Sequence, residues 1–132
     1  MMMKPMLPIV LLSAFGLYAT GSVQAQSVYE PYFFTRYAGL TGTAGSTDGA
    51  RTAASFNHPG DLAMDTDGNI YVADTDNHTI RKITAAGVVS TLAGAPGEFG
   101  TADGSGGAAR FSFPTGIAIA TNGDLYVADY GN

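Results

Sequence analysis

Two histidines and a series of aspartates are the side chains of this chain that could bind a metal ion. His58 and His78 are its only histidines, and imidazole nitrogens combined with carboxylates form many metal sites. At the position matching His58 in an internal repeat, described below, the chain has Phe113, so no ligand pattern recurs. The chain has no cysteine, which rules out a disulfide framework. We therefore expect no metal site and no cofactor.

A second candidate is a calcium loop beginning at Asp65. Such a loop needs oxygen ligands at positions 1, 3 and 5, glycine at position 6 and glutamate at position 12. Counted from Asp65, Gly68 falls at position 4 and Asp76 at position 12, so the match fails. The Asp-Gly pair instead predicts a hairpin turn, as does the Asn-Gly pair ending at Gly123, because glycine adopts positive φ without steric cost.

The remaining candidates recur along the chain, which favours structure over catalysis. Asp74 and Asp129 each close an apolar run, and Asn77 and Asn132 each follow three residues later. Short carboxylates and amides accept backbone N–H bonds and organise turns, whereas a catalytic group is needed once per site. No Gly-x-Ser-x-Gly, phosphate loop or His-Glu-x-x-His motif occurs. We predict no catalytic residue and six structural turn residues, namely Gly68, Asp74, Asn77, Gly123, Asp129 and Asn132.

These residues belong to a repeat with an offset of 55 residues. The stretch PGDLAMDTDGNIYVADTDNHTIRKI begins at Pro59, and PTGIAIATNGDLYVADYGN begins at Pro114. The alignment needs no gap, and places Tyr71-Val-Ala-Asp on Tyr126-Val-Ala-Asp. It defines repeat unit one at 56–93, a truncated repeat unit two at 111–132, and Gly-rich inter-unit loops at 42–55 and 97–110.

Each unit reads as a set of short strands. In unit one we expect strands at 62–65, 69–74, 79–83 and 88–93 from their β-branched and aromatic content. Residues 70–73 are apolar at consecutive positions, which predicts a strand covered on both faces. Four antiparallel strands per unit, stacked between like units, form the blade of a β-propeller. A leading strand is expected at 33–38.

The motifs of unit one resemble the NHL repeat. The resemblance rests on Asp-Gly-Asn-Ile-Tyr-Val-Ala-Asp at 67–74 and Asn-His-Thr-Ile-Arg-Lys-Ile at 77–83. The loop Ala-Asp-Gly-Ser-Gly-Gly-Ala-Ala-Arg-Phe at 102–111 is similar to the exported bacterial branch of that family, and the resemblance covers 34–132. It implies an all-β, NHL-type β-propeller, with a turn-packing role for His78. Asp76 stands where the family often has glycine.

The chain accounts for an incomplete propeller, about one whole blade plus part of a second. Because propellers close into rings of typically about 4–8 blades, we expect an N-terminal piece of a longer protein whose remaining blades complete the ring. Residues 33–38 would then supply a strand to the last blade. The alternative is self-assembly of several short chains. Alone, the chain should be unstable, with Ile70 and Val72, or Tyr71 and Ala73, facing water.

The first residues have the pattern of a signal peptide. Lys4 precedes an apolar run at 7–19, and Val23 and Ala25 fit the small residues before a cleavage site. The apolar run is shorter than the roughly 20 residues of a membrane-spanning helix. We therefore expect a signal peptide at 1–25, a mature chain at 26–132, export to the periplasm or the extracellular space, and no stable membrane anchor after cleavage.

Two classes of function remain. The net charge of −5 and the absence of a basic patch exclude nucleic acid as a partner. The resemblance implies an exported, non-catalytic NHL-repeat propeller that acts as a binding scaffold for protein or glycan. The alternative is part of an exported propeller enzyme, of the lyase or lactonase type, with a metal in the central channel. Fold alone does not choose between them.

Overall fold

Seven β-strands and three short 3₁₀ helices make up the part of the chain that the structure, a computed structural model, describes. That part is residues 35–132; the predicted signal peptide and the first two residues of the predicted leading strand lie outside it. In chain order the elements are β1 (Gly49–Ala50), η1 (Arg51–Ala53), β2 (Pro59–Met64), β3 (Ile70–Asp74), η2 (Thr75–Asn77), β4 (Thr79–Ile83), β5 (Val88–Ala93), η3 (Gly106–Ala108), β6 (Pro114–Ile119) and β7 (Leu125–Asp129).

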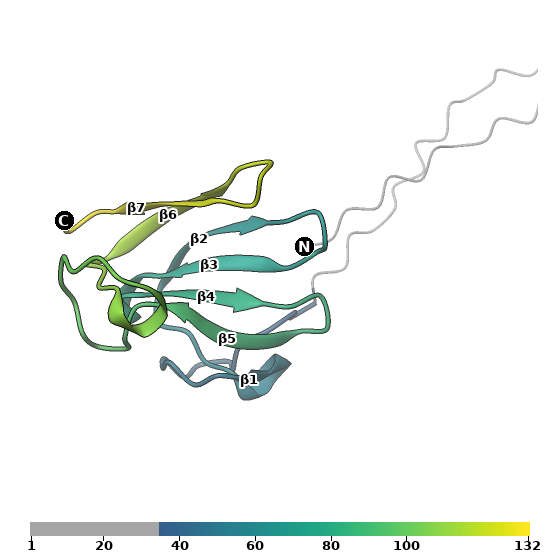
Figure 1. Ribbon diagram of the computed structural model, residues 1–132. Helices are drawn as coiled ribbons and strands as arrows, with labels where there is room; N and C mark the ends of the chain where they lie inside the picture. Colours follow the sequence, from purple (N-terminus) through teal and green to yellow (C-terminus); the bar gives the residue numbers. More distant parts are fainter. Residues whose placement is uncertain (1–34) are drawn as a thin grey trace, which may run out of the picture. The chain divides into compact units, whose positions relative to one another are not determined.

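The strands form one antiparallel sheet and a separate hairpin. The sheet has the order β1-β5-β4-β3-β2, and β6 pairs with β7 alone (Figure 1). Leu62 of β2 lies opposite Val72, and Ile117 of β6 lies opposite Val127, so the two hairpins share one register. The backbone φ is 81° at Gly68 and 91° at Gly123, as two matching hairpin turns require. The prediction of one whole propeller blade plus part of a second is confirmed.

Strand β3 is buried on both sides because successive side chains of a strand point to opposite faces. Val72 belongs to a core cluster with Ile83 and Val89, and this side of the sheet is called the front face. Ala73 belongs to a second cluster with Ile80 and Ile117, and this side is called the back face. Unit two therefore packs on the back face of unit one.

The front face is covered by a segment that precedes unit one, contrary to expectation. Tyr37 and Ala54 of this segment, with Phe56 at the start of unit one, pack in the cluster that contains Val72, which is only 6% exposed. The Tyr37 hydroxyl also donates to the carbonyl of Ala85 at 2.8 Å, which fixes the segment across the β4–β5 turn. The prediction that one face of β3 would be open to water is wrong, because the Gly-rich loop 42–55 and the residues before it fold back over that face.

The predicted leading strand at 33–38 is also wrong in its described part. Residues 35–38 form no strand. The residues that follow bond to the loop instead. The N–H of Gly39 donates to the carbonyl of Arg51 at 3.0 Å, and the N–H of Leu40 donates to the carbonyl of Ala54 at 2.8 Å. The outer edge of β5 is paired by β1, whose Gly49 lies opposite Val89.

Candidate functional site

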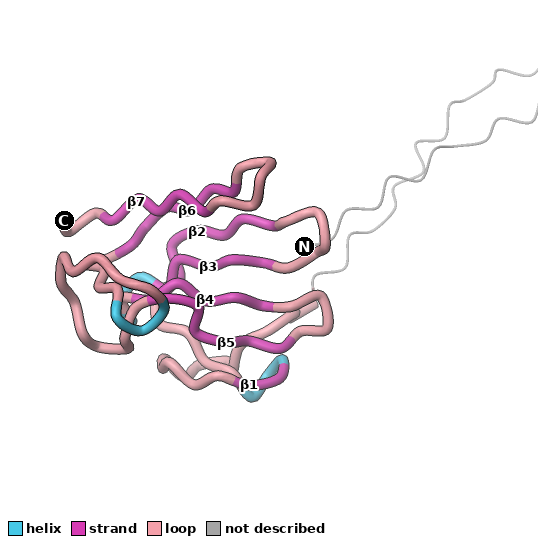
Figure 2. Tube along the Cα trace, in the orientation of Figure 1, coloured by secondary structure: helices cyan, strands magenta, loops and turns pink. Residues whose placement is uncertain are grey.

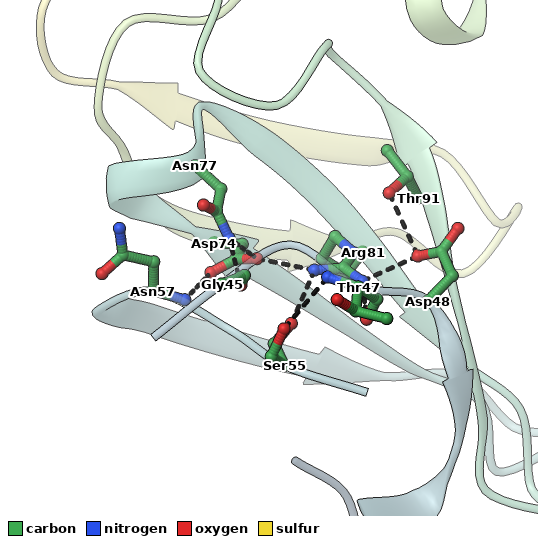
Figure 3. Close-up of polar contacts among 9 residues, drawn as sticks. All are labelled: Gly45, Thr47, Asp48, Ser55, Asn57, Asp74, Asn77, Arg81 and Thr91. Carbon is green, nitrogen blue, oxygen red and sulfur yellow. Dashed lines mark hydrogen bonds and ion pairs between the residues drawn. The ribbon is translucent and has the colours of Figure 1, made fainter. Parts of the chain in front are cut away.

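Asp74, the last residue of β3, joins three segments of unit one (Figure 3). Its Oδ1 accepts the N–H of Asn57 at 2.7 Å. Its Oδ2 accepts from Asn77 Nδ2 at 2.7 Å and from Arg81 Nη1 at 2.8 Å. The side chain is completely buried. Asp74 therefore holds the start of β2, the η2 turn and β4 together at one end of the blade.

Arg81 is the buried cation that this carboxylate pairs with, and the sequence analysis did not single it out. It is 0% exposed, and its Nη1 also donates to the carbonyl of Ser55 at 3.0 Å. Its Nη2 donates to Asp48 Oδ1 at 2.7 Å and to the carbonyl of Thr47 at 3.1 Å. Its guanidinium lies 5.1 Å from the ring centre of Phe56. Arg81 thus binds the front-face loop to the sheet.

A signal for this pair was present in the sequence. Across the β3–β4 ladder Asp74 lies opposite Thr79, and Arg81 lies two residues further along. Diagonal neighbours on one face of a sheet are within reach of long side chains. An arginine on the buried face of a strand, diagonal to an aspartate, predicts an ion pair. The loop carbonyls could not be foreseen, because they come from residues far away in sequence.

Unit two repeats the turn around its own aspartate. Asp129 Oδ1 accepts the N–H of Ser112 at 2.7 Å, as Asp74 does for Asn57. Asn132 Nδ2 donates to Asp129 Oδ2 and to the carbonyl of Gly100 at 2.7 Å. In unit one, Asn77 Nδ2 donates in the same way to the carbonyl of Gly45 at 2.8 Å. Gly45 is the residue that matches Gly100 in the repeat. Asp129 and Asn132 of unit two thus lie at the place that Asp74 and Asn77 take in unit one.

The structure does not bring the two histidines together. His78 is buried at a left-handed turn position, and its Nδ1 accepts the N–H of Phe113 at 3.1 Å, which places the ring proton on Nε2. His58 is exposed, and its Nδ1 lies 2.7 Å from Asp76 Oδ2. Among residues 35–132, no three His, Asp or Glu side chains gather as a metal-binding group.

Asp61 is a carboxylate on β2 that does not recur, since Gly116 occupies its place in unit two. Its Oδ2 accepts the N–H of Ile117 at 3.1 Å, across the two units, and its Oδ1 accepts that of Leu62 at 2.8 Å. The backbone N–H of Ile117, followed by that of Leu62, holds the pKa of the Asp61 carboxyl below its usual value. Asp61 therefore acts as a tie between units.

Asp65 organises the β2–β3 turn that had been weighed as a calcium loop. Its Oδ1 accepts the backbone N–H groups of Asp67 and Asn69 at 3.0 and 2.8 Å. Its Oδ2 accepts from Asn69 Nδ2 at 2.8 Å and from the Tyr71 hydroxyl at 3.1 Å. The hydrogen bond from the Asn69 side chain is the main cause that lowers the pKa of the Asp65 carboxyl. Both oxygens are thus engaged by the turn itself.

Two aromatic rings that the sequence pattern did not predict lie beside His78, and Tyr130 is linked to one of these residues through the backbone. The ring of Phe113 is 4.6 Å from that of His78, the ring of Phe99 is 5.7 Å away, and the N–H of Tyr130 donates to the carbonyl of Phe113. All three are exposed, Phe99 by 70%. We call Phe99, Phe113 and Tyr130 the aromatic rim patch.

The patch is specific to unit two. At the matching positions, 55 residues earlier, the chain has Ala44 in the loop before unit one, and His58 and Thr75 in unit one. A residue that supports the blade itself should recur with the repeat, whereas these three depart from it. The signal that could have found them is therefore the set of exposed aromatic residues out of register between the two copies. A contiguous patch of exposed apolar groups marks a contact surface.

The sequence of the chain is similar to that of known proteins with NHL repeats. The NHL repeat family matches residues 56–83 and 111–132. The chain is 40% identical over 89 residues to SUPPRESSOR OF QUENCHING 1 of Arabidopsis thaliana, covering 67% of this chain and 8% of that protein. It is 35% identical over 85 residues to human Teneurin-4, covering 54% of this chain and 3% of that protein. It therefore spans a small part of these relatives.

Solved structures are similar over most of the chain. An auxiliary nutrient binding protein from Bacteroides ovatus superposes with a TM-score of 0.62 and 29% identity, covering 70% of this chain and 25% of that one. A protein of unknown function from Bacteroides thetaiotaomicron superposes with a TM-score of 0.66 and 31% identity, covering 70% and 24%. Within residues 35–132 the structure contains no helix of the length and apolarity that crossing a bilayer requires.

Proposed function

We propose, from the premise that this chain carries NHL repeats and folds as part of an NHL-type β-propeller, that it is an exported, non-catalytic binding module. Its ligand is a protein or a glycan, held on the rim formed by the turns and loops at the His78 end of the units. The aromatic rim patch is the observation that carries this proposal. Aromatic residues are enriched at binding interfaces because they bury a large apolar area with few torsions to fix.

The hydrogen bonds made by the charged side chains support a binding role over catalysis. Asp74 and Arg81 bond to each other. Asp74 also accepts from Asn57 and Asn77, and Arg81 donates to Thr47, Asp48 and Ser55 of the front-face loop, while its Nε has no partner among the described residues. Asp61 and Asp65 are engaged by backbone N–H groups. The alternative, a propeller enzyme of the lyase or lactonase type with a metal in the central channel, is not favoured by any arrangement of the described residues.

The names of similar proteins also support a binding role. One superposing structure belongs to a protein named for auxiliary nutrient binding in Bacteroides ovatus, and another to a protein of the same name in Bacteroides thetaiotaomicron. Export rests on the signal peptide proposed for residues 1–25. Protein recovered outside the cytoplasm should begin at Gln26, within a few residues, by N-terminal sequencing. Recovery of such protein with Met1 intact would contradict export by cleavage.

The binding proposal is tested by substitutions copied from unit one. Phe99→Ala, Phe113→His and Tyr130→Thr give unit two the residues that unit one carries at the same positions, so the fold should tolerate them. The triple variant and the wild type would be compared on a glycan array and by capture of extracellular proteins, followed by calorimetry with each hit. Leu92→Ala, at an exposed position outside the patch, is the matched control.

We expect the triple variant to lose at least about tenfold in affinity, which corresponds to roughly 1.4 kcal/mol, while Leu92→Ala binds as the wild type. Equal affinity of all three proteins for a hit would place the ligand away from the rim patch and refute this site. The absence of any hit among glycans and proteins would refute the binding role itself.

A further inference from the structure

The turn between β6 and β7 contains an asparagine that is followed by glycine. The pair is Asn122-Gly123, whereas Asn57, Asn69 and Asn77 are followed by histidine or isoleucine. Figure 2 shows the turn as a loop at the end of the β6–β7 hairpin. Asn122 is exposed, and a Cβ at Gly123 would meet no atom within 4 Å. Because glycine has no side chain, its backbone nitrogen is open to attack on the neighbouring side-chain amide.

The exposure of this turn recurs in the repeat. In the matching turn of unit one, Asp67 stands in the place of Asn122 and is also exposed. Unit two packs on unit one and still leaves Asp67 open to solvent. A repeat unit beside the turn therefore does not cover it.

The hydrogen bonds of the two turns differ at one point. In unit two, the N–H of Asp124 donates to Asn122 Oδ1 at 3.1 Å. In unit one, the N–H of Asn69, at the place of Asp124, donates to Asp65 Oδ1 at 2.8 Å. The residue of unit two that matches Asp65 is Ala120, which has no carboxylate. The N–H of Asp124 is therefore left for the side chain of Asn122.

A donor on Oδ1 favours nucleophilic attack on the amide carbon of Asn122. Negative charge develops on a carbonyl oxygen when a nucleophile adds to its carbon, and a fixed N–H group stabilises that charge. The N–H of Gly123 donates to the carbonyl of Ala120 at 2.9 Å, and that of Gly68 makes the matching bond to Asp65 at 3.2 Å. That bond is common to both turns, so the bond to Oδ1 is what distinguishes Asn122.

We propose that Asn122 is a site of spontaneous deamidation in the folded protein. The backbone nitrogen of Gly123 bonds to the side-chain carbonyl carbon of Asn122 and gives its proton to water. The side-chain nitrogen takes a proton from water and leaves as ammonia. Water then opens the cyclic imide at either carbonyl, which gives aspartate or isoaspartate. The reaction consumes only water, and it is independent of the ligand proposed for the aromatic rim patch.

The product changes both the charge and the backbone of unit two. Asn122 Nδ2 donates to Asp124 Oδ2 at 2.8 Å, and aspartate at position 122 replaces this bond with repulsion between two carboxylates. Isoaspartate adds a methylene group to the main chain, beside the pair Ile119 and Leu125 that adjoins the turn. Deamidation therefore weakens the β6–β7 hairpin.

The test places the same dipeptide in both turns of one molecule. Asp67→Asn gives unit one an asparagine before Gly68, in a turn where Asp65 already accepts the N–H of Asn69. Asn122→Gln keeps an amide but lengthens the side chain, and serves as the negative control. The full chains are incubated at neutral and mildly alkaline pH, in buffer and in urea, with circular dichroism to verify β structure in buffer.

The products are measured by peptide mass spectrometry. Tryptic cleavage after Arg51, Arg81 and Arg110 puts positions 67 and 122 on different peptides. Incubation in water enriched in heavy oxygen marks each hydrolysed imide, because the new carboxylate takes one oxygen from the solvent. Chromatography separates the aspartate product from the isoaspartate product.

In buffer, we expect Asn122 to convert roughly fivefold faster than the asparagine introduced by Asp67→Asn, which is the effect of one ordinary hydrogen bond on a rate constant. In urea the two positions should convert at similar rates, because the bonds of the turns are lost. Asn122→Gln should give no product at position 122. Equal rates at the two positions in buffer, or a slower rate at Asn122, would overturn the proposal. So would an Asn122 that stays intact in buffer while it converts in urea.

Discussion

At the residue scale, the pairing of Asp74 with Arg81 is the main polar feature of unit one. Both side chains are fully buried, and a buried charge is tolerated only where a partner and hydrogen bonds replace water. Arg81 meets this condition with Asp74 and three further acceptors drawn from the front-face loop. The pair therefore couples the loop to the sheet, and its loss should affect both.

Removing Arg81 should strongly destabilise the fold. Arg81→Ala leaves Asp74 buried without its cation, and breaking a buried ion pair in this way costs about 3–5 kcal/mol. Arg110→Ala is the control, because Arg110 pairs at 2.7 Å with Glu98 in an exposed setting, where an ion pair contributes at most about 1 kcal/mol. Urea denaturation measures both. Equal losses of unfolding free energy would contradict the role given to Arg81.

The Asp61 tie between the units should make stability depend on pH. Its folded pKa is lowered from 3.8 by the N–H groups of Ile117 and Leu62, so folding favours the ionised form. The contribution is therefore complete above the unfolded pKa of about 3.9 and is lost as pH falls through the lower folded pKa. Asp61→Asn should flatten the stability curve on the acid side of pH 4 in thermal unfolding. An unchanged acid limb would contradict the tie.

At the element scale, the β-branched and aromatic runs of the sequence predict the bounds of those strands that pair with their neighbours along the chain. Strands β4 and β5 run from Thr79 to Ile83 and from Val88 to Ala93, as predicted. Strand β2 begins at Pro59, earlier than predicted, because its pairing with Asp74 extends it past a bulge. Strand β1 could not be predicted, because its two residues lie in a Gly-rich loop without a strand pattern. They form a strand only because they pair with the outer edge of β5.

Within the candidate site, contacts between residues close in sequence could be predicted, and contacts between distant residues could not. The turns at Gly68 and Asp74 are local, so their chemistry could be inferred from a few neighbouring residues. The partners of Arg81 in the loop are 26–34 residues away in sequence, and no periodicity relates them. In the aromatic rim patch, Phe99 and Phe113 meet at the ring of His78, and Tyr130 is linked to Phe113 by a backbone hydrogen bond.

The turn glycines provide a test at this scale. Gly68 has a φ of 81°, and a Cβ there would meet only Ala85 at an ordinary 3.6 Å. Gly68→Val should therefore destabilise through backbone strain, by about 1 kcal/mol or more. Gly107→Val is the control, because a Cβ there has space and no positive φ is imposed. Chemical denaturation compares them, and an equal cost at both positions would refute the strain argument.

At the scale of the whole molecule, the described chain is held together by stacking of faces. The back face of unit one receives unit two through Ile117, and the front face receives the preceding segment through Tyr37 and Ala54. This cover means that the chain buries more of β3 than the sequence suggested. The exposed remainder lies on β2 and β7, at Leu62 and Tyr126. Instability of the isolated chain stays a prediction, and a purified monomer that unfolds cooperatively would contradict it.

The most direct test of this account is the contact between the two units in solution. With methyl-labelled isoleucine, NMR can detect proximity between Ile117 of β6 and Ile80 of β4, which share one buried cluster. We predict a clear nuclear Overhauser effect between these methyl groups and slow hydrogen exchange at the Ile117 amide, which donates to Asp61. A folded unit one in which Ile117 shows neither the cross-peak nor protection would contradict the stacked propeller arrangement.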